Sequence, residues 1–264
     1  FYTQSSEETR LQTGLGPLEF LRNKKLIETY LTSEKMYIAD VGGGTGHYAS
    51  WLASLGHKVI LIDPVKKHID RAVRRAKEIG PHFQTILGHA GAIPVLDQSM
   101  DLVIFHGPLY HLSKREDRIT AIREARRIVR PSGTVLGFAI SHAASTLAAL
   151  QNGMIHNEEI FQMCKSELSS GLHLPPNGLG GILPEAFFHR PAQLIEEFEE
   201  AGFKTDKVLA VEGISWTSAS FFSDWADPRK RDRLLDLAQL TQADQQLLSF
   251  SPHLMIAAFP DLQL

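Results

Sequence analysis

The sequence has a single cysteine, no apolar run long enough to cross a membrane, and no excess of charge of one sign. Cys164 is the only cysteine among 264 residues, which excludes an internal disulfide and a cysteine-based metal cluster. Every apolar run is shorter than the roughly 20 residues that a membrane-spanning helix needs, and the first thirty residues are too polar for a secretory signal. We therefore expect a cytoplasmic protein without a membrane segment.

The charges are nearly balanced, with 27 basic and 30 acidic residues and a formal net charge of −3. This balance lacks the electrostatic footprint of a protein that binds nucleic acid, so we expect no nucleic-acid partner. The basic runs at 71–77 and 114–130 alternate with acidic or apolar residues at helical spacing, and we interpret them as solvated helix faces. The hydrophobic fraction of 43% is that of an ordinary globular protein.

Apolar periodicity predicts alternating strands and helices along most of the chain. The predicted strands are the seven segments 36–41, 58–62, 83–87, 102–105, 134–140, 204–211 and 253–259. The predicted helices are the segments 46–55, 64–79, 114–129, 191–201 and 229–240. Long helical crossovers imply a mostly parallel sheet that is covered on both faces. The predicted fold class is therefore α/β, with a doubly wound seven-stranded sheet.

Two segments fall outside this alternation. Residues 1–33 predict a helical cap, interrupted at Gly14, Gly16 and Pro17, that precedes a main domain of residues 34–264. Residues of about 142–190, after the fifth strand, predict two helices followed by a stretch rich in glycine and proline. A long irregular insertion of this kind is typical of a lid or a binding element.

A glycine-rich loop joins the first predicted strand to its helix. The run Asp40-Val41-Gly42-Gly43-Gly44-Thr45-Gly46 lies at the carboxyl end of a buried strand, where open parallel sheets bind ligands. Asp63, at the end of the next strand, is placed to accept hydrogen bonds from ribose hydroxyls. The pattern indicates an adenosine-containing ligand but does not distinguish a nicotinamide dinucleotide from S-adenosylmethionine.

Residues 40–46 resemble motif I of the class I S-adenosylmethionine-dependent methyltransferases, including the acid at the strand end. Two later runs are similar to further motifs of that family, Asp97-Gln98-Ser99-Met100-Asp101-Leu102-Val103 and Ile128-Val129-Arg130-Pro131-Ser132-Gly133. The runs at 107–112 and 188–191, with the N-terminal runs at 7–11 and 18–20, resemble a bacterial subset that acts on small molecules. The resemblance implies the Rossmann-like methyltransferase fold, with S-adenosylmethionine as cofactor and S-adenosylhomocysteine as product.

The resemblance also implies roles for individual residues in binding the cofactor. Asp40 and the loop glycines would line its methionine half, Asp63 would hold its ribose and Pro64 would flank its adenine. The implied cofactor-binding set is Asp40, Gly42, Gly43, Gly44, Gly46, Asp63, Pro64, His89, Ala90 and His106. His89 departs from the pattern because it stands where the family commonly has an acid that accepts from the adenine amine.

Methyl transfer from a sulfonium chiefly requires a nucleophile held in line with the S–CH₃ bond at roughly 3 Å in a dry site. The loop after the fourth strand faces the methyl group in this fold, so Tyr110 and His111 are candidate catalytic residues, and His189 joins them from the lid boundary. Each could equally be a satisfied structural residue. The scattered histidines show no metal-ligand spacing, and we expect no metal. Apolar residues of the lid would suit a small apolar or aromatic acceptor.

Two alternatives remain open. A nicotinamide-dependent oxidoreductase would use the same loop, and Tyr110 and Lys114 have the Tyr-x-x-x-Lys spacing, although they follow Gly107 and Pro108 in a loop rather than lying on a helix. An RNA or protein methyltransferase would share motif I. The sequence indicates neither the oligomeric state nor the accepting atom.

Overall fold

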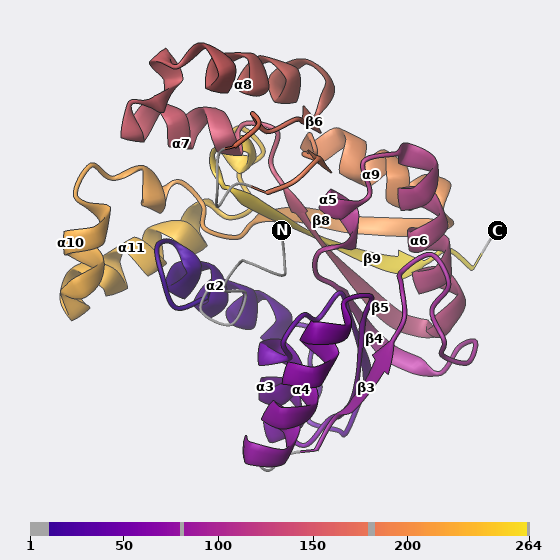
Figure 1. Ribbon diagram of the computed structural model, residues 1–264. Coiled ribbons are helices and arrows are strands. Elements are labelled where there is room, and N and C mark those ends of the chain that lie inside the picture. The colour runs from indigo at the N-terminus through magenta and orange to yellow at the C-terminus, as the bar shows by residue number, and fades with distance from the viewer. Residues whose placement is uncertain (1–10, 80–81, 179–182, 263–264) are drawn as a thin grey trace. The chain divides into compact units, whose positions relative to one another are not determined.

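The computed structural model describes residues 11–79, 82–178 and 183–262 (Figure 1). The predictions for residues 1–10, including most of the run at 7–11, lie outside this range. In the described part of the chain, no helix combines the length and the apolar composition that a bilayer crossing requires.

A seven-stranded sheet forms the centre of the fold, in the order β3-β2-β1-β4-β5-β9-β8. Its strands are β1 (Tyr37–Val41), β2 (Lys58–Asp63), β3 (Gln84–Leu87), β4 (Met100–Phe105), β5 (Val129–Ile140), β8 (Phe203–Ala210) and β9 (His253–Pro260). The first five strands pair in parallel, with β1 between β2 and β4. The strand order reverses direction at β1, which creates the crevice where ligands bind in such sheets. The predicted doubly wound α/β fold is confirmed.

The helices beside these strands are α2 (Gly16–Glu28), α3 (His47–Ser54), α4 (Lys66–Ile79), α5 (Pro108–His111), α6 (Arg115–Ile128) and α9 (Pro191–Glu200). Helices α3, α4, α6 and α9 lie where the sequence predicts them, whereas α5 corrects the expectation of a loop, because it places Tyr110 on a short helix. Helix α6 buries Ile119, Ile122 and Ala125, which recur at three-residue spacing on one face. It ends at Ile128, before Pro131, which lacks the N–H that a further helical turn would need.

The contacts divide the chain into two compact units. The first unit holds residues 1–26, 139–194 and 208–255, and the second holds residues 27–138, 195–207 and 256–264. Strands β1–β4 and helices α3–α6 belong to the second unit, and β5, β8 and β9 pass from one unit into the other. The predicted division into a cap at 1–33 and a main domain at 34–264 stays a prediction.

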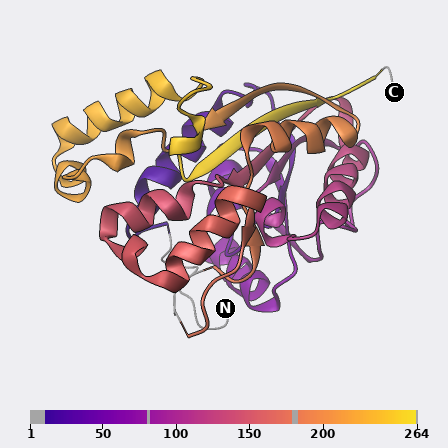
Figure 2. The same ribbon diagram turned by 90° about the horizontal axis from the view of Figure 1, so that it is seen from above.

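The first unit contains the segment between β5 and α9 that the sequence predicts as a lid. Its elements are α7 (Ala144–Asn152), η1 (Met154–His156), α8 (Glu158–Ser170), β6 (Leu172–His173) and β7 (Ala186–Phe187). Helices α7 and α8 lie side by side (Figure 2) and enclose Ala149, Ile160, Met163 and Cys164. His173 Nδ1 lies 2.6 Å from Glu167 Oε1, and both side chains are buried, so this pair ties α8 to β6.

The rest of the first unit is formed by η2 (Ser215–Thr217), α10 (Phe221–Ala226), α11 (Pro228–Thr241) and η3 (Leu248–Phe250). Leu18 of α2 packs with Trp216 and Phe221 in a second apolar cluster. Of the apolar lid residues, Ile160, Met163 and Phe188 are therefore core, whereas Met154 and Phe161 are exposed.

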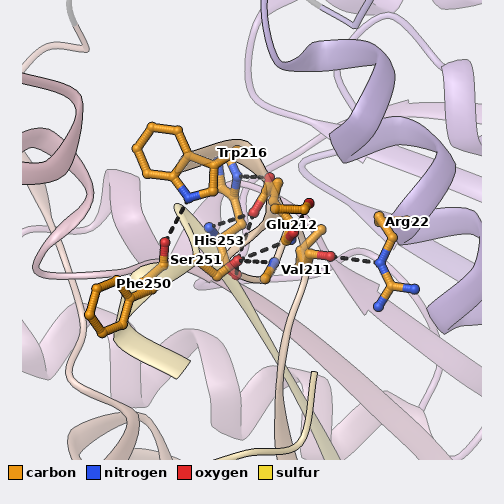
Figure 3. Close-up of polar contacts among 9 residues, drawn as sticks. Arg22, Val211, Glu212, Trp216, Phe250, Ser251 and His253 are labelled. Carbon is orange, nitrogen blue, oxygen red and sulfur yellow. Dashed lines mark hydrogen bonds and ion pairs between the residues drawn. The ribbon is translucent and has the colours of Figure 1, made fainter. Parts of the chain in front are cut away.

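A buried polar network anchors α2 within the same unit (Figure 3). Arg22 donates from Nε to the carbonyl oxygen of Val211 at 2.8 Å, and from Nη2 to Gln242 Oε1 at 2.6 Å. Ser251 donates to Glu212 Oε2, and His253 Nδ1 lies 2.6 Å from Glu212 Oε1. Burial lowers the pKa of Arg22, and the nearby charge of Glu212 opposes that effect. These bonds satisfy charged groups that would otherwise be costly to bury.

Three sequence-based expectations need correction or extension. Arg118 is 1% exposed, so the interpretation of its run as a solvated helix face is wrong at this position. Strand β5 begins at Val129 rather than Thr134, because Val129 pairs with Met100 before a shift in register. Helix α10 and the β6–β7 pair have too few residues for apolar periodicity to reveal them.

Replacing Gly137 of β5 by alanine is expected to lower the free energy of unfolding by about 1–3 kcal/mol. A Cβ at this position would lie 2.6 Å from Cζ of the fully buried Phe198. Urea unfolding followed by circular dichroism measures the change. Gly91→Ala is the control, expected to change stability by less than about 0.5 kcal/mol, because its Cβ would approach nothing closer than 3.4 Å. Equal stability of the two variants would contradict this account of the packing.

Candidate cofactor-binding site

The glycine loop connects β1 to α3 and lies against the backbone that follows β4. Gly42 has φ +77°, and a Cβ there would lie only 1.9 Å from the carbonyl oxygen of His106 and 2.8 Å from Pro108 Cδ. Only glycine fits this close approach. The contact brings the loop after β1 together with the loop after β4, both of which the sequence predicts to be functional.

Asp63 at the end of β2 holds the glycine loop from the other side. Its Oδ2 accepts from the N–H of Gly44 at 3.0 Å, and its Oδ1 accepts from the N–H of Val65 at 2.9 Å. His68 Nδ1 lies 3.0 Å from Asp63 Oδ1, which fixes the proton on that nitrogen when the carboxylate is ionised. A carboxylate has about four lone-pair positions, so Oδ2 can still accept from a ligand hydroxyl.

Asp40 is a fully buried carboxylate at the end of β1. Among the residues that the structure describes, neither of its oxygens has a hydrogen-bond partner, and the nearest polar ring atom is His106 Nδ1 at 3.8 Å from Oδ1. The His106 ring is stacked between Tyr48 and Phe138, with centroid distances of 4.2 and 4.1 Å. An ionised carboxylate without donors is costly to bury, so this site favours a ligand that brings a positive charge or donors.

These residues fit the cofactor that the family resemblance implies. The ammonium of the methionine part would supply the donors that Asp40 lacks, and a ribose hydroxyl would supply a donor to Asp63 Oδ2. Gly43 has its Cα against the carboxylate of Asp40, where a Cβ would lie 2.5 Å from Oδ2. A side chain at Gly43 would therefore overlap the carboxylate of Asp40.

The other residues expected at the cofactor are arranged around the ends of β2 and β3. Pro64 is exposed, Ala90 is buried, and His89 is exposed with Nδ1 beside Gly91. The N–H of Ala92 donates to the backbone carbonyl of His89, so the backbone here forms a tight turn. The adenine roles of Pro64, His89 and Ala90 remain predictions.

The structure brings two of the three candidate catalytic residues together. Tyr110 and His111 lie on α5 in the second unit, with ring centroids 4.6 Å apart, and both side chains are partly exposed. Gly107 precedes them with φ +98°, and its Cα borders the carbonyl oxygen of Gly42. The side chains thus follow directly on the turn that contacts the glycine loop.

His189 lies in the first unit, where it is fully buried. Its N–H donates to the carbonyl oxygen of Ile140 at 2.7 Å, its carbonyl oxygen accepts from the N–H of His142, and its ring meets Phe187 edge-on. Burial, followed by the nearby charge of Arg190, lowers the pKa of the neighbouring His142. Backbone hydrogen bonds to Ile140 and His142 hold His189 in place. Its catalytic role remains a prediction.

Sequence reasoning missed several residues that build this site. His68 could have been found from its place in the first turn of α4, five residues after Asp63. Arg75 donates from Nε to the carbonyl oxygen of Thr45 at 3.0 Å, and so fixes the end of the glycine loop. The stacking of Tyr48 and Phe138 on His106 left no signal, because the three residues lie on separate elements.

Three potential metal ligands meet in the first unit, although their sequence spacing gave no sign of it. Glu19, Glu212 and His253 offer ligand atoms that all lie within 4.8 Å of one another. Glu212 lies near the charge of Arg22, and His253 Nδ1 lies 2.6 Å from Glu212 Oε1. The expectation that no metal takes part stays a prediction.

Part of the chain is similar in sequence to known proteins. Residues 38–133 match the family model described as a methyltransferase domain. The tRNA 5-carboxymethoxyuridine methyltransferase of Escherichia coli (strain K12) is 31% identical over 174 residues, which are 65% of this chain and only 60% of that protein.

Solved structures of low sequence identity share the fold. An S-adenosylmethionine-dependent methyltransferase of Methanosarcina mazei has a TM-score of 0.61 at 18% identity, covering 88% of this chain and 95% of its own. The 1,6-didemethyltoxoflavin-N1-methyltransferase of Burkholderia thailandensis, solved with S-adenosylhomocysteine, has a TM-score of 0.54 at 12% identity, covering 97% of this chain and 80% of its own.

Asp63→Ala is expected to weaken S-adenosylhomocysteine binding by at least about tenfold, or ~1.4 kcal/mol. The substitution removes a predicted ribose acceptor and also leaves the N–H groups of Gly44 and Val65 without their acceptor. Isothermal titration calorimetry measures the affinity. Asp70→Ala removes an exposed carboxylate from α4 that pairs with Lys66, and should leave the affinity unchanged. Equal affinities of both variants would exclude Asp63 from the site.

Proposed function

Because the chain belongs to the class I S-adenosylmethionine-dependent methyltransferases, we propose that it transfers a methyl group to an oxygen or nitrogen atom of a small-molecule acceptor. The same proposal places the enzyme in the cytoplasm, because a protein with one buried cysteine suits a reducing compartment in which disulfides are rare. The activity, the acceptor and the location belong to this proposal.

The observation that carries the proposal is the buried carboxylate of Asp40, whose two oxygens lack hydrogen-bond partners among the described residues. It lies beside a loop that only glycine can form at Gly42. A cationic amino acid moiety would satisfy this carboxylate, whereas the pyrophosphate of a nicotinamide dinucleotide would bring negative charge toward it. This difference favours S-adenosylmethionine over NAD(P) as the ligand, and methyl transfer over oxidoreduction.

The donor, when bound, supplies an already activated methyl group on a sulfonium. The residues of this chain would then bind the donor and the acceptor, orient them, and exclude water from the site. Tyr110 and His111 are proposed to contact the acceptor, and His111 to accept its proton where the accepting group is protonated. His189 is proposed to support the acceptor from the lid segment.

The small-molecule acceptor is supported by the formal net charge of −3, which gives no general attraction to a polyanion. The main alternative is an RNA acceptor, and it rests on a separate observation. The Escherichia coli relative with 31% identity is named as a tRNA methyltransferase, and its match reaches beyond residues 38–133.

Titration calorimetry is expected to show S-adenosylhomocysteine binding with micromolar or tighter affinity, and no binding of NADH or NADPH under the same conditions. The reason is the charge preference of the pocket at Asp40. Absence of S-adenosylhomocysteine binding to the wild-type chain would overturn the proposed function, and tight NADH binding would favour the oxidoreductase alternative.

Transfer of a tritiated methyl group to acceptors in a bacterial extract is expected to identify the acceptor class. A small-molecule acceptor predicts label that passes a 3-kDa filter and resists ribonuclease, with Asp63→Ala as the inactive control. Label that is retained by the filter and released by ribonuclease would reject the small-molecule proposal in favour of RNA. Label that is retained and released by protease would reject it in favour of protein.

A further inference from the structure

The loop at 107–113 carries Tyr110 and His111 but has little structure of its own. Helix α5 is one turn of four residues, and a single turn of helix is unstable without packing or external bonds. At its start, the loop is fixed by the contact between Gly42 and the backbone of His106. The residues that fix the carboxyl end of this loop must lie elsewhere in the fold.

Arg118 of α6 provides that second fixed point. Its Nη1 donates to the carbonyl oxygens of Leu112 and Ser113, both at 2.9 Å, which are the last two residues of the loop. Arg118 is 1% exposed. A guanidinium can make both bonds while its remaining N–H groups face another partner, because its five donors lie in one fixed plane.

Glu197 of α9 is that other partner. Its carboxylate accepts from Arg118 Nε at 3.0 and 3.1 Å and from Nη2 at 2.6 Å, and its side chain is also buried. The two-point pairing neutralises the buried charge and sets the plane of the guanidinium. The direction of Nη1 toward Leu112 and Ser113 therefore depends on Glu197.

We propose that Arg118, oriented by Glu197, is a positioning residue that holds Tyr110 and His111 toward the methyl acceptor. The inference rests on the proposed function, because that function makes this loop the acceptor side of the site. The five hydrogen bonds of Arg118 join α6, α9 and the loop within one unit, so the loop has the rigidity of the two helices. Neither Arg118 nor Glu197 contacts the glycine loop in any described bond, so cofactor affinity should not depend on them.

A second pair between the same two helices offers a matched control. Arg115 Nη2 lies 2.6 Å from Glu200 Oε2, with side chains 49% and 42% exposed. This pair joins α6 to α9 through the same residue types, but it makes no described bond to residues 107–113. Exposed pairs of this kind contribute little to stability.

The test compares two double variants of the full chain, Arg118→Met/Glu197→Met and Arg115→Met/Glu200→Met. Replacing both members of a buried pair by apolar residues of similar volume often preserves stability, so the first variant should still fold. Backbone amide exchange is measured by mass spectrometry, and S-adenosylhomocysteine affinity by calorimetry. We expect exchange in 107–113 to accelerate at least about tenfold in the first variant only, with exchange in β1–β4 and cofactor affinity unchanged.

Unchanged exchange in 107–113 would overturn the proposal, and so would an equal acceleration throughout residues 27–138, which would indicate a purely structural pair. If the first variant does not fold, the single variant Arg118→Lys takes its place, since it keeps the charge but cannot make all the bonds together. Because exchange is read without activity, the positioning role can fail while the proposed function stands. Absence of cofactor binding by the wild type would instead remove the function on which the inference rests.

Discussion

The backbones after β1 and after β4 touch at Gly42, where any side chain would overlap the carbonyl oxygen of His106. The cofactor side and the proposed acceptor side of the site follow from this contact. It places the buried carboxylate of Asp40 beside the His106 ring, and it starts the loop that carries Tyr110 and His111. The reversal of strand order between β1 and β4 brings the two loops to the same edge of the sheet.

Buried ion pairs and hydrogen bonds then hold irregular segments to regular ones. Asp63 fixes the glycine loop and the start of α4, the Arg118–Glu197 pair fixes the loop after β4, and the Glu167–His173 pair joins α8 to β6. Each joins segments whose backbone bonds alone would leave them loosely placed. Such pairs add little net stability compared with an apolar core, but leaving one member unpaired is costly, and this favours a single arrangement.

Asp40 is the exception, and the proposed ligand site lies at this residue. Its carboxylate has the burial of a core residue but no described hydrogen bond, whereas Asp63 has bonds to two backbone N–H groups. A native fold rarely buries a charge without compensation. The proposed donor fits this difference, because S-adenosylmethionine brings a charged amino group, and residues 38–133 match a methyltransferase domain.

Much of the sheet and the position of the glycine loop at a strand end could be predicted from sequence, because local patterns determine them, whereas the cofactor-binding roles stay predictions. Strand β2 buries alternate and then successive apolar residues, and the run from Asp40 to Gly46 stands at a strand end, so both are recognisable within a few residues. The roles of Arg118, Glu197 and the rings around His106 could not be predicted. Their partners lie on other elements, 79 positions away in the pair of Arg118 and Glu197. By itself the sequence determined which segments form strands and helices and where a nucleoside could bind, since these depend on neighbouring residues. Only the tertiary structure decided which charges are buried together, because a pairing such as Arg118 with Glu197 exists only after two distant helices have packed.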